Sequence, residues 1–535
     1  MAYLQASRKA AQKAASVYLY MFSWHTPMLD GRPRSFHCSE IPFAFANTDR
    51  CENYTGASKE ARKLGEKVAK AWINFARCGD PNHFILIGLN SYPQNLVNWW
   101  LTTGDKSALL AQQKPIAFGK NENSGNVPTI NINPLQKYQS VDGFGFALTG
   151  GSAQLMFRMA DEERKKLLQE LFGKGSKDIG ISYLRLSIGS SDLNDHTFSY
   201  DDLSPGEKDL SLNKFSLKED EKEVIPVMKE ILAINPDIKI LGSPWSAPLW
   251  MKSNNNIQGG RLKDEYYSVY AKYFVKYIQG MKQHGINIDA ITIQNEPFND
   301  GNTPSMQFLA KEELRFIKNN LGPAFKSAGI KAKIILYDHN CDAPEYPISI
   351  LTDPDANKYV DGSGFHLYVG QTSAMSKVHD AFPNKNLYFT EMMAVSRTDF
   401  NVANPEERII IGATRNWSKN VILWNIAADP NNKPHTDNGG CPSCQGAVTI
   451  DGDSVSRNLA YYTMGHISKF VPPNSVRIES SLPEGLSNVA FKTPQGKTVL
   501  IVANKGKSAQ SFRIVDQKRT LNTTLNGESV ATFMW

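Results

Sequence analysis

The stretch Ile291-Thr-Ile-Gln-Asn-Glu-Pro297 starts as a short β-branched run and ends in polar residues and a proline. A run of this kind predicts a buried strand that ends near Gln294 and leaves Asn295 and Glu296 just beyond it. Seven similar segments lie between about residues 140 and 470, at 143–148, 183–188, 238–242, 334–337, 364–367, 387–390 and 421–424. Amphipathic helical patterns lie between or after them, at 161–172, 218–234, 264–284, 311–326 and 457–470.

Eight strands that alternate with helices predict an α/β fold, a closed (β/α)8 barrel. The alternation also fits a doubly wound open sheet, but the placement of the polar residues favours the barrel. These residues stand at the C-terminal ends of the strands, and they are Ser187, Ser243, Asn295, Asp338, His366, Glu391 and Asn425. Because this end of a barrel is its catalytic face, the pattern predicts an enzyme whose site lies there.

The regions on either side of the barrel have a different pattern. Short strands with turn signals follow it, at 488–492, 498–503 and 511–515, and a further strand is predicted just before it, at 128–133. This pattern is typical of a β-sandwich, here built from both sides of the barrel. We therefore expect an N-terminal mixed α/β segment and linker at 1–95, the first sandwich strands at 97–138, the barrel at 139–472 and the remaining sandwich at 473–535.

The composition is that of an ordinary globular protein, with 535 residues, a formal net charge of +6 and 21% charged residues. Lysine and arginine are interspersed with acidic residues, so no nucleic-acid partner is expected. No apolar run approaches the roughly 20 residues that span a bilayer, and the N-terminus lacks the apolar core and cleavage site of a secretion signal. The sequence as written therefore predicts a cytoplasmic protein without a membrane span.

The cysteines are too sparse for a disulfide framework. They are Cys38, Cys51, Cys78, Cys341, Cys441 and Cys444. Cys441 and Cys444 form a CxxC pair, but no second CxxC or HxxxH follows at the spacing of a zinc finger. We expect a loop disulfide or plain loop cysteines there in preference to half of a zinc site.

Two of the strand-end residues fit the chemistry of glycoside hydrolysis. Hydrolysis with retention needs two carboxyl groups about 5 to 5.5 Å apart, one to protonate the leaving group and one to attack the anomeric carbon. Glu296 follows the fourth strand and Glu391 ends the seventh, on opposite sides of a small barrel mouth. We expect Glu296 to be the general acid/base and Glu391 the nucleophile, with Asn295 placed to hydrogen-bond a sugar hydroxyl. Carboxyl groups perform both steps, so no metal or organic cofactor is expected.

Six motifs occur in order within residues 97–535. They are Asp142-Gly-Phe-Gly-Phe-Ala-Leu-Thr-Gly150, Tyr183-Leu-Arg-Leu-Ser-Ile-Gly-Ser-Ser-Asp192, Gly242-Ser-Pro-Trp-Ser-Ala-Pro-Leu-Trp-Met-Lys252, Gln294-Asn-Glu-Pro297, Phe365-His-Leu-Tyr368 and Phe389-Thr-Glu391. Together they resemble glycoside hydrolase family 30, the family of lysosomal glucosylceramidase and of bacterial β-glucosidases and β-1,6-glucanases. The resemblance implies a retaining β-glycosidase with its acid/base at Glu296 and its nucleophile at Glu391. It also implies an ancestral enzyme that was secreted or periplasmic.

The resemblance further implies a glucose-binding subsite. Its residues are Asp192, Trp245, Asn295 and Trp424, with Arg185, His366 and Tyr368 supporting the carboxylates. Indole faces can pack on the C–H face of a sugar, and an arginine can pair with the nucleophile and keep it ionised. Without the motifs, these aromatic residues would be interpreted as barrel core. Asp338 fits either a carboxylate at the substrate rim or a structural hydrogen bond to a neighbouring loop.

The leaving group is not fixed by these motifs. The stretch 431–445 after the eighth strand differs from the corresponding loops of the mammalian lipid hydrolase, so recognition of ceramide does not follow from the resemblance. The expected substrate is a β-glucoside or β-glucan, with glucosylceramide and β-1,6-linked glucan both open. A carbohydrate-binding protein with an inactive barrel is the alternative from another class, although the presence of both glutamates speaks against it.

The first 95 residues resemble the C-terminal end of a type-B carboxylesterase, through residues 17–22, 30–45 and 71–82. The histidine of that family's catalytic triad falls on His37. The chain contains no Gly-x-Ser-x-Gly nucleophile elbow, so residual esterase activity through His37 is the weaker alternative. An amphipathic helix at 58–76 would lack the sheet that its apolar face covers. We interpret the segment as a truncated fragment joined by gene rearrangement or by cloning from mixed DNA, and 84–89 as a remnant of a signal sequence.

Overall fold

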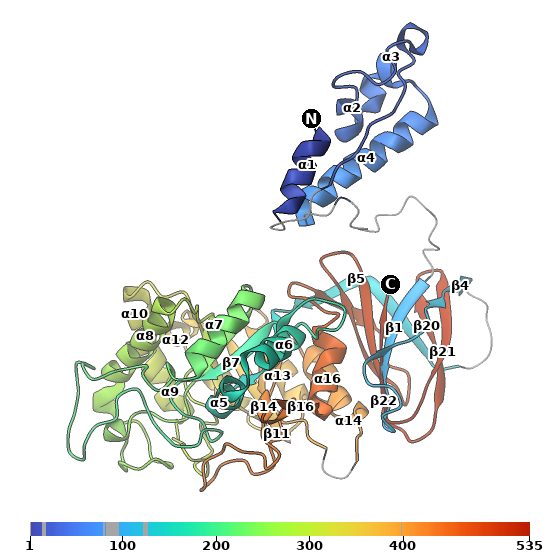
Figure 1. Ribbon diagram of the computed structural model, residues 1–535. Helices are drawn as coiled ribbons and strands as arrows, with labels where there is room; N and C mark the ends of the chain where they lie inside the picture. Colours follow the sequence, from blue (N-terminus) through green and yellow to red (C-terminus); the bar gives the residue numbers. More distant parts are fainter. Residues whose placement is uncertain (1, 13–17, 79–80, 82–95, 121–126, 397–398) are drawn as a thin grey trace. The chain divides into compact units, whose positions relative to one another are not determined.

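The computed structural model describes residues 2–12, 18–78, 81, 96–120, 127–396 and 399–535. The run 84–89, interpreted above as a remnant of a signal sequence, lies outside the described residues. The chain forms two compact units, Met1–Tyr92 and Pro93–Trp535. The larger unit contains a closed barrel and a large, mostly antiparallel sheet (Figure 1).

Eight parallel strands form the barrel, in the order β10-β11-β12-β13-β6-β7-β8-β9. Their bounds are β6 Gly143–Leu148, β7 Tyr183–Ser187, β8 Lys239–Ser243, β9 Ala290–Thr292, β10 Lys333–Cys341, β11 Val360–Gly370, β12 Asn386–Glu391 and β13 Ser418–Leu423. Each strand overlaps a predicted one, so the predicted (β/α)8 fold is confirmed. The pairing of β13 with β6 closes the cylinder and excludes the open sheet.

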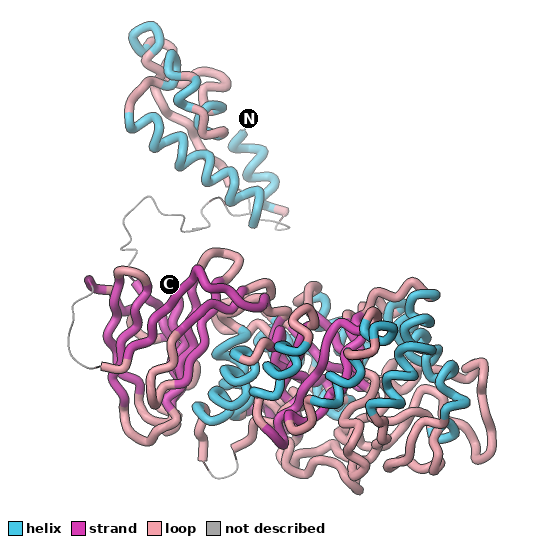
Figure 2. The backbone as a smooth tube through the Cα atoms, turned by 180° about the vertical axis from the view of Figure 1, so that it is seen from behind, coloured by secondary structure: helices cyan, strands magenta, loops and turns pink. Residues whose placement is uncertain are grey.

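Helices surround these strands (Figures 1 and 2). Their bounds are α5 Gly150–Arg158, α6 Asp161–Phe172, α7 Val224–Ile234, α8 Tyr267–Gln283, α9 Ala310–Phe316, α10 Gly322–Ser327, α11 Glu345–Leu351, α12 Pro354–Asn357, α13 Ser373–Ala381, α14 Ala403–Pro405, α15 Gly412–Arg415 and α16 Leu459–Ser468. A layer of apolar side chains fills the barrel below its C-terminal end, formed by Tyr183, Leu241, Ala290, Ile335, Tyr388 and Ile422. The barrel interior is therefore a packed apolar layer, and the strand-end residues lie above it at the C-terminal end of the barrel.

Two predicted helices differ from the structure, and a proline explains each difference. The helix predicted at 218–234 begins only at Val224, because the ring of Pro226 would clash with the carbonyl of Lys222 in a longer helix. The helix predicted at 311–326 is interrupted by a π-helical turn, Ile317–Leu321, between α9 and α10. Pro323 has no N–H to donate to the preceding turn, which favours this local change in hydrogen bonding.

The large sheet has the strand order β2-β1-β22-β19-β18-β17-β5-β20-β21-β4, with β3 paired to β1. The bounds of these strands are β1 Leu96–Thr102, β2 Ala111–Gln112, β3 Ile116–Ala117, β4 Gly119–Lys120, β5 Thr129–Ser140, β17 Val476–Ser480, β18 Ser487–Lys492, β19 Thr498–Asn504, β20 Gln510–Asp516, β21 Arg519–Leu525 and β22 Ser529–Met534. The sheet takes strands from both sides of the barrel in the sequence. One apolar core joins Val97 and Phe533, near one end of the strand order, to Ile130 and Ile514 near the other, so the sheet folds over as a sandwich.

The sandwich is attached to the barrel by buried polar contacts. The ring of His466 in α16 contacts Thr532 Oγ1 of β22 at 2.9 Å and Thr102 Oγ1 of β1 at 2.8 Å. Arg415 donates to the backbone carbonyl of Ser480 at 3.0 Å. A smaller sheet of β14 (Ala427–Ala428), β15 (Val448–Asp451) and β16 (Ser454–Arg457) extends the loop that follows β13.

The smaller unit contains α1 (Ala2–Ala11), α2 (Ile41–Ala44), α3 (Glu52–Thr55) and α4 (Lys59–Cys78). No strand occurs among the residues of this unit that the structure describes, although the sequence predicted a mixed α/β fragment. Residues 18–27 form neither a helix nor a strand. Helix α4 leaves Trp72, Ile73 and Phe75 about half exposed, as expected for a helix that lacks the sheet it would cover.

Within the described parts of the chain, every helix is too short or too polar to cross a lipid bilayer.

Candidate active site

Glu296 and Glu391 lie at the C-terminal end of the barrel, and their exposed fractions are only 6% and 5%. Glu391 is the last residue of β12, so the strand itself fixes its position. Glu296 follows β9 in a loop, and its φ of 47° is in the left-handed region that non-glycine residues rarely adopt. A backbone hydrogen bond from Glu296 N to Asp338 O, at 3.0 Å, holds this conformation. Such backbone strain clusters at functional sites.

The two glutamates meet at one histidine. His366 Nδ1 lies 3.2 Å from Glu296 Oε1 and 3.9 Å from Glu391 Oε1, so these two oxygens are at most about 7 Å apart. This limit includes the separation of about 5 to 5.5 Å found in retaining glycosidases, and it excludes most of the range of about 6.5 to 9.5 Å found in inverting ones.

Glu391 is held on both of its oxygens. Arg185 donates to Oε2, and the hydroxyl of Tyr368 donates to Oε1 at 2.9 Å. Burial raises the pKa of the Glu391 carboxyl, as do two neighbouring carboxylates, and His366 and Arg185 oppose that rise. The paired donors fix the direction of this carboxylate into the site.

Asp338 is the buried centre of the hydrogen-bond network. Its carboxylate accepts from Arg185 at 2.7 Å, from Thr292 at 2.6 Å, from Thr390 at 2.6 Å and from His366 Nε2 at 3.0 Å. Burial would raise its pKa, but Arg185 and His366 outweigh burial and hold the pKa of this carboxyl below its usual range. Asp338 is therefore not at the substrate rim. The bonds of its carboxylate go to residues of the barrel strands, not to a neighbouring loop.

The position of Asp338 fixes the tautomer of His366. Because the ionised Asp338 carboxylate can only accept, His366 Nε2 carries a hydrogen. The contact between His366 Nδ1 and Glu296 Oε1 then holds one proton, on the imidazole or on the carboxyl group. Burial lowers the pKa of the His366 imidazole, but three neighbouring carboxylates outweigh burial and raise this pKa to about 9.

Three residues around Glu296 were not predicted from the sequence. The side-chain amides of Asn299 and Asn302 donate to Glu296 Oε2 at 2.6 and 3.4 Å, and His339 Nδ1 lies 3.9 Å from Oε1. Burial raises the pKa of Glu296, but the hydrogen bond from His366 and the nearby His339 and Asn299 give a net lowering. His339 directly follows Asp338, the predicted end of the fifth strand, and that position was the one signal that could have indicated it.

The predicted sugar-binding residues lie around the same network. Trp245 and Trp424 stack with their ring centroids 5.4 Å apart, and the Arg185 guanidinium lies 4.8 Å from the Trp245 ring. Asn295 Oδ1 accepts from Arg185 at 2.7 Å. Burial raises the pKa of Asp192 to about 8, and the charges of Glu391 and Glu296 add to that rise. The structure thus brings all nine predicted site residues together.

The loop after β13 carries a disulfide between Cys441 and Cys444, whose Cα atoms are 5.7 Å apart. A loop disulfide was one of the two sequence predictions for this pair, and half of a zinc site is excluded. Cys444 is buried in a cluster with Trp245 and Trp424. The disulfide closes a short turn within the loop, and the packing of Cys444 places that turn against the aromatic wall of the site.

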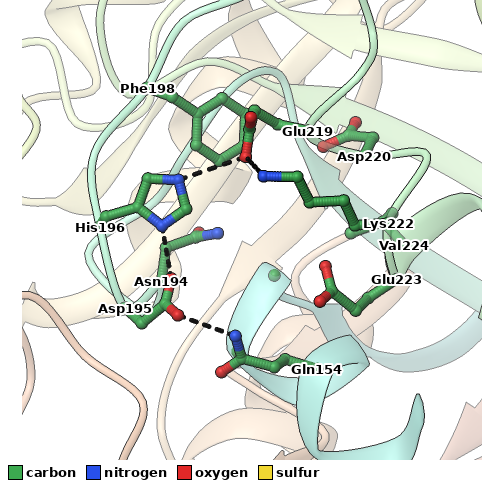
Figure 3. A pocket seen from close by; sticks show the side chains of 12 residues that line it. Gln154, Asn194, Asp195, His196, Phe198, Glu219, Asp220, Lys222, Glu223 and Val224 are labelled. Carbon is green, nitrogen blue, oxygen red and sulfur yellow. Dashed lines mark hydrogen bonds and ion pairs between the residues drawn. The ribbon is translucent and has the colours of Figure 1, made fainter.

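A separate polar hollow lies outside this network (Figure 3). Its lining includes His196, whose ring nitrogens lie 2.6 Å from Asp195 and 3.3 Å from Glu219. Lys222 also pairs with Glu219, at 2.5 Å. None of the predicted site residues lines this hollow, and four of its charged side chains, Asp195, His196, Glu219 and Lys222, pair with one another.

The family model of the glycosyl hydrolase family 30 TIM-barrel domain matches residues 141–471, and that of the family 30 beta sandwich domain matches residues 474–533. The chain belongs to glycoside hydrolase family 30. It is accordingly a glycoside hydrolase, as the strand-end glutamates indicated. The carboxylesterase family model matches residues 1–126, which include the smaller unit and the first four strands of the sandwich.

The relatives of this family 30 chain include endo-1,6-β-glucanases and glucosylceramidases. An endo-1,6-beta-D-glucanase of Neurospora crassa is 36% identical, over 70% of this chain and 81% of its own. The lysosomal acid glucosylceramidase of Mus musculus is 28% identical, over 76% of this chain and 83% of its own. Among solved structures, the endo-beta1,6-glucanase BT3312 is 33% identical with a TM-score of 0.75, and it covers 82% of this chain and 99% of its own.

Proposed function

We propose that this family 30 chain is a retaining β-glycosidase that cleaves β-1,6-linked glucan by double displacement, with Glu391 as nucleophile and Glu296 as general acid/base. One observation carries the proposal: the two carboxylates face the same nitrogen of His366 with oxygens at most about 7 Å apart. That separation suits direct attack by one carboxylate on a carbon whose leaving group the other protonates.

In the first step, a Glu391 oxygen attacks the anomeric carbon while the bond from that carbon to the leaving oxygen breaks. Glu296 gives its proton to the leaving oxygen, and a glycosyl ester of Glu391 forms. In the second step, Glu296 takes a proton from water as the water oxygen attacks the anomeric carbon. The ester bond breaks, Glu391 leaves as a carboxylate, and two inversions give net retention.

The surroundings of the two glutamates support this division of roles. Glu391 is bonded on both oxygens by donors from barrel strands, so it is oriented as a nucleophile must be. Glu296 is bonded by loop amides on Oε2 only, while Oε1 faces His366 across the contact that holds one proton. A group that repeatedly gives and takes a proton needs such a partner nearby.

The subsite for the sugar is supported by the aromatic wall and by Asp192. The indoles of Trp245 and Trp424 offer apolar surface for the C–H face of a pyranose. With a pKa raised to about 8, Asp192 is protonated at neutral pH and can donate a hydrogen bond to a sugar hydroxyl as well as accept one.

The choice of β-1,6-glucan over glucosylceramide is supported by the relatives. Two fungal endo-1,6-β-glucanases, of Aspergillus fumigatus and Neurospora crassa, are 34% and 36% identical to the chain, whereas the mouse glucosylceramidase is 28% identical. The solved endo-β1,6-glucanase resembles the whole barrel and sandwich.

The test is hydrolysis of linear β-1,6-glucan followed by proton NMR of the first product. We expect the β-anomer of the product to appear first and to mutarotate later. We also expect β-1,6-glucan to be turned over faster than an aryl β-xyloside or glucosylceramide in micelles. Glu391→Gly with added azide should give a glycosyl azide of inverted configuration. Initial release of the α-anomer would contradict retention, and turnover of glucosylceramide alone would contradict the substrate.

A further inference from the structure

His339 has a ring nitrogen without a partner. The residue is 7% exposed, and within the part of the chain that the structure describes its Nδ1 has no hydrogen bond. This atom lies 3.9 Å from Glu296 Oε1. A buried polar atom without a partner is unfavourable, so the orphan nitrogen points to a ligand that supplies the missing bond.

Three ligand atoms converge at this point. Glu296, His339 and His366 each offer one, and these atoms lie within 4.8 Å of one another. His366 Nδ1 is 3.2 Å from Glu296 Oε1. Ligand atoms of a tetrahedral zinc ion, with bonds of about 2.0 to 2.1 Å, lie about 3.3 Å apart. Small side-chain rotations would therefore bring all three atoms to the spacing of metal ligands.

His366 is already oriented as metal-binding histidines are. Its Nε2 donates to the Asp338 carboxylate at 3.0 Å, which leaves Nδ1 directed at Glu296. A carboxylate behind the imidazole is the usual support for a ligating histidine, because it fixes the tautomer and makes the other nitrogen more basic.

The local charge also favours a cation. Once the proton between His366 and Glu296 is displaced, the carboxylates of Asp338, Glu296 and Glu391 carry three negative charges against the single positive charge of Arg185. A divalent ion balances that excess. Two imidazole nitrogens and one carboxylate oxygen suit zinc, cobalt, nickel or copper, whereas magnesium and calcium prefer oxygen ligands alone.

We propose that Glu296, His339 and His366 form an inhibitory site for a borderline divalent cation such as Zn²⁺. The ion takes the place of the proton between Glu296 Oε1 and His366 Nδ1. Its fourth position is open to water or to Glu391 Oε1, which lies 3.9 Å from His366 Nδ1. The inhibition rests on the proposed role of Glu296 as acid/base, but binding of the ion does not.

The test is a calorimetric titration of the full chain with ZnCl₂ in buffer without reductant or chelator, alongside Co²⁺ absorption in the visible region. We expect one Zn²⁺ per chain whose Kd weakens at least tenfold in both His339→Ala and His339→Gln. The glutamine variant keeps most of the side-chain volume, so the test survives if the alanine variant fails to fold. His196→Ala is the matched control, because two carboxylates also flank that histidine and it lies outside the site.

Glycosidase activity is measured in the same samples. Zn²⁺ should inhibit the wild-type enzyme, and the midpoint of inhibition should shift with the Kd in the His339 variants but not in His196→Ala. Equal Zn²⁺ affinity in the wild type and both His339 variants would overturn the site, and so would the absence of binding at millimolar Zn²⁺. Binding at this site without inhibition would overturn the inhibitory effect and the acid/base role of Glu296, while leaving the ion site in place.

Discussion

Helices α4 and α8 are both amphipathic, but their apolar faces have different surroundings. In the barrel, α8 buries Tyr270, Tyr273 and Phe274 completely against its neighbours. In the smaller unit, α4 leaves Trp72 and Phe75 about half exposed, and their rings meet those of Tyr20 and Tyr18 edge-on. An amphipathic pattern therefore predicts which face of a helix is apolar, but it does not predict whether another element of the chain covers that face. The larger unit covers the apolar face of α8, whereas the smaller unit leaves much of the apolar face of α4 exposed.

The comparison predicts that catalysis resides entirely in the larger unit. Loss of a catalytic carboxylate should therefore lower kcat more than any other change considered below. Glu296→Gln should lower kcat on a β-glucan by about 10²- to 10⁴-fold, because a general acid contributes that much. Glu391→Gln should lower it further, since no covalent step remains. Initial rates on glucan and on a dinitrophenyl glucoside provide the check. The activated leaving group needs no acid, so Glu296→Gln should retain much of its first step, and equal loss on both substrates would contradict the assignment.

The second prediction concerns the buried charge network beneath the site. Arg185→Ala leaves Asp338 and Glu391 buried without their cation, and removing one partner of such a pair costs about 3–5 kcal/mol of folding stability. Urea unfolding followed by tryptophan fluorescence measures the loss.

Arg164→Ala is the matched control for this variant. Arg164 is also buried, but its partners Asp161 and Glu230 have side chains 77% and 30% exposed, so they remain solvated without it. Its removal should cost clearly less than that of Arg185. Equal losses in the two variants would mean that the network beneath the glutamates has no special role.

The third prediction concerns a buried acid next to the sandwich. Glu406 is fully buried in the π-helical segment Glu406–Ile411, and among the described residues neither of its carboxyl oxygens has a hydrogen-bond partner. Burial raises its pKa well above the usual value. The folded state therefore keeps a proton that the unfolded state loses above about pH 4.5, and stability falls as pH rises from there toward the folded pKa.

Glu406→Gln removes that titration. The variant should gain stability over the wild type by up to about 1.4 kcal/mol per pH unit within this window and should match it below pH 4. Urea unfolding midpoints from pH 4 to pH 8 measure the difference. Parallel pH dependences of the two proteins would show that Glu406 is ionised in the folded state.

The smallest effect is expected from removing the smaller unit. Deletion of residues 1–92 should change kcat/KM on glucan less than twofold, because the larger unit contains its own cores and every proposed site residue. Loss of activity in a soluble, folded truncation would show that the segment contributes to catalysis.

No esterase activity is expected from the smaller unit. The full chain should hydrolyse nitrophenyl acetate no faster than its His37→Ala variant, because the chain has no nucleophile elbow.

The barrel and the two glutamates were predictable because both depend on short-range patterns. Each β-branched run specifies a strand, and a glutamate at or shortly after the C-terminal end of a barrel strand lies at the catalytic end of the barrel. Asn299 and Asn302 were missed because their positions depend on how the loop after β9 folds, including the left-handed turn at Glu296. His339 was missed because β10 continues to Cys341, beyond the predicted strand end. The two interpretations of Asp338 could not be separated because burial at the network centre is a tertiary property. The mixed α/β character expected for the N-terminal segment could not be judged for the same reason, since a strand needs a neighbour and none forms among the described residues of the smaller unit.

The most direct test of the account is mass-spectrometric mapping of the enzyme after reaction with a 2-deoxy-2-fluoro-β-glucoside that carries an activated leaving group. Fluorine slows the second displacement more than the activated first one, so the covalent sugar accumulates. The account predicts one fluoroglucosyl group per chain, attached to Glu391 and absent from the Glu391→Gln variant. A label on Glu296 would reverse the two roles, and steady turnover without any label would contradict the covalent mechanism.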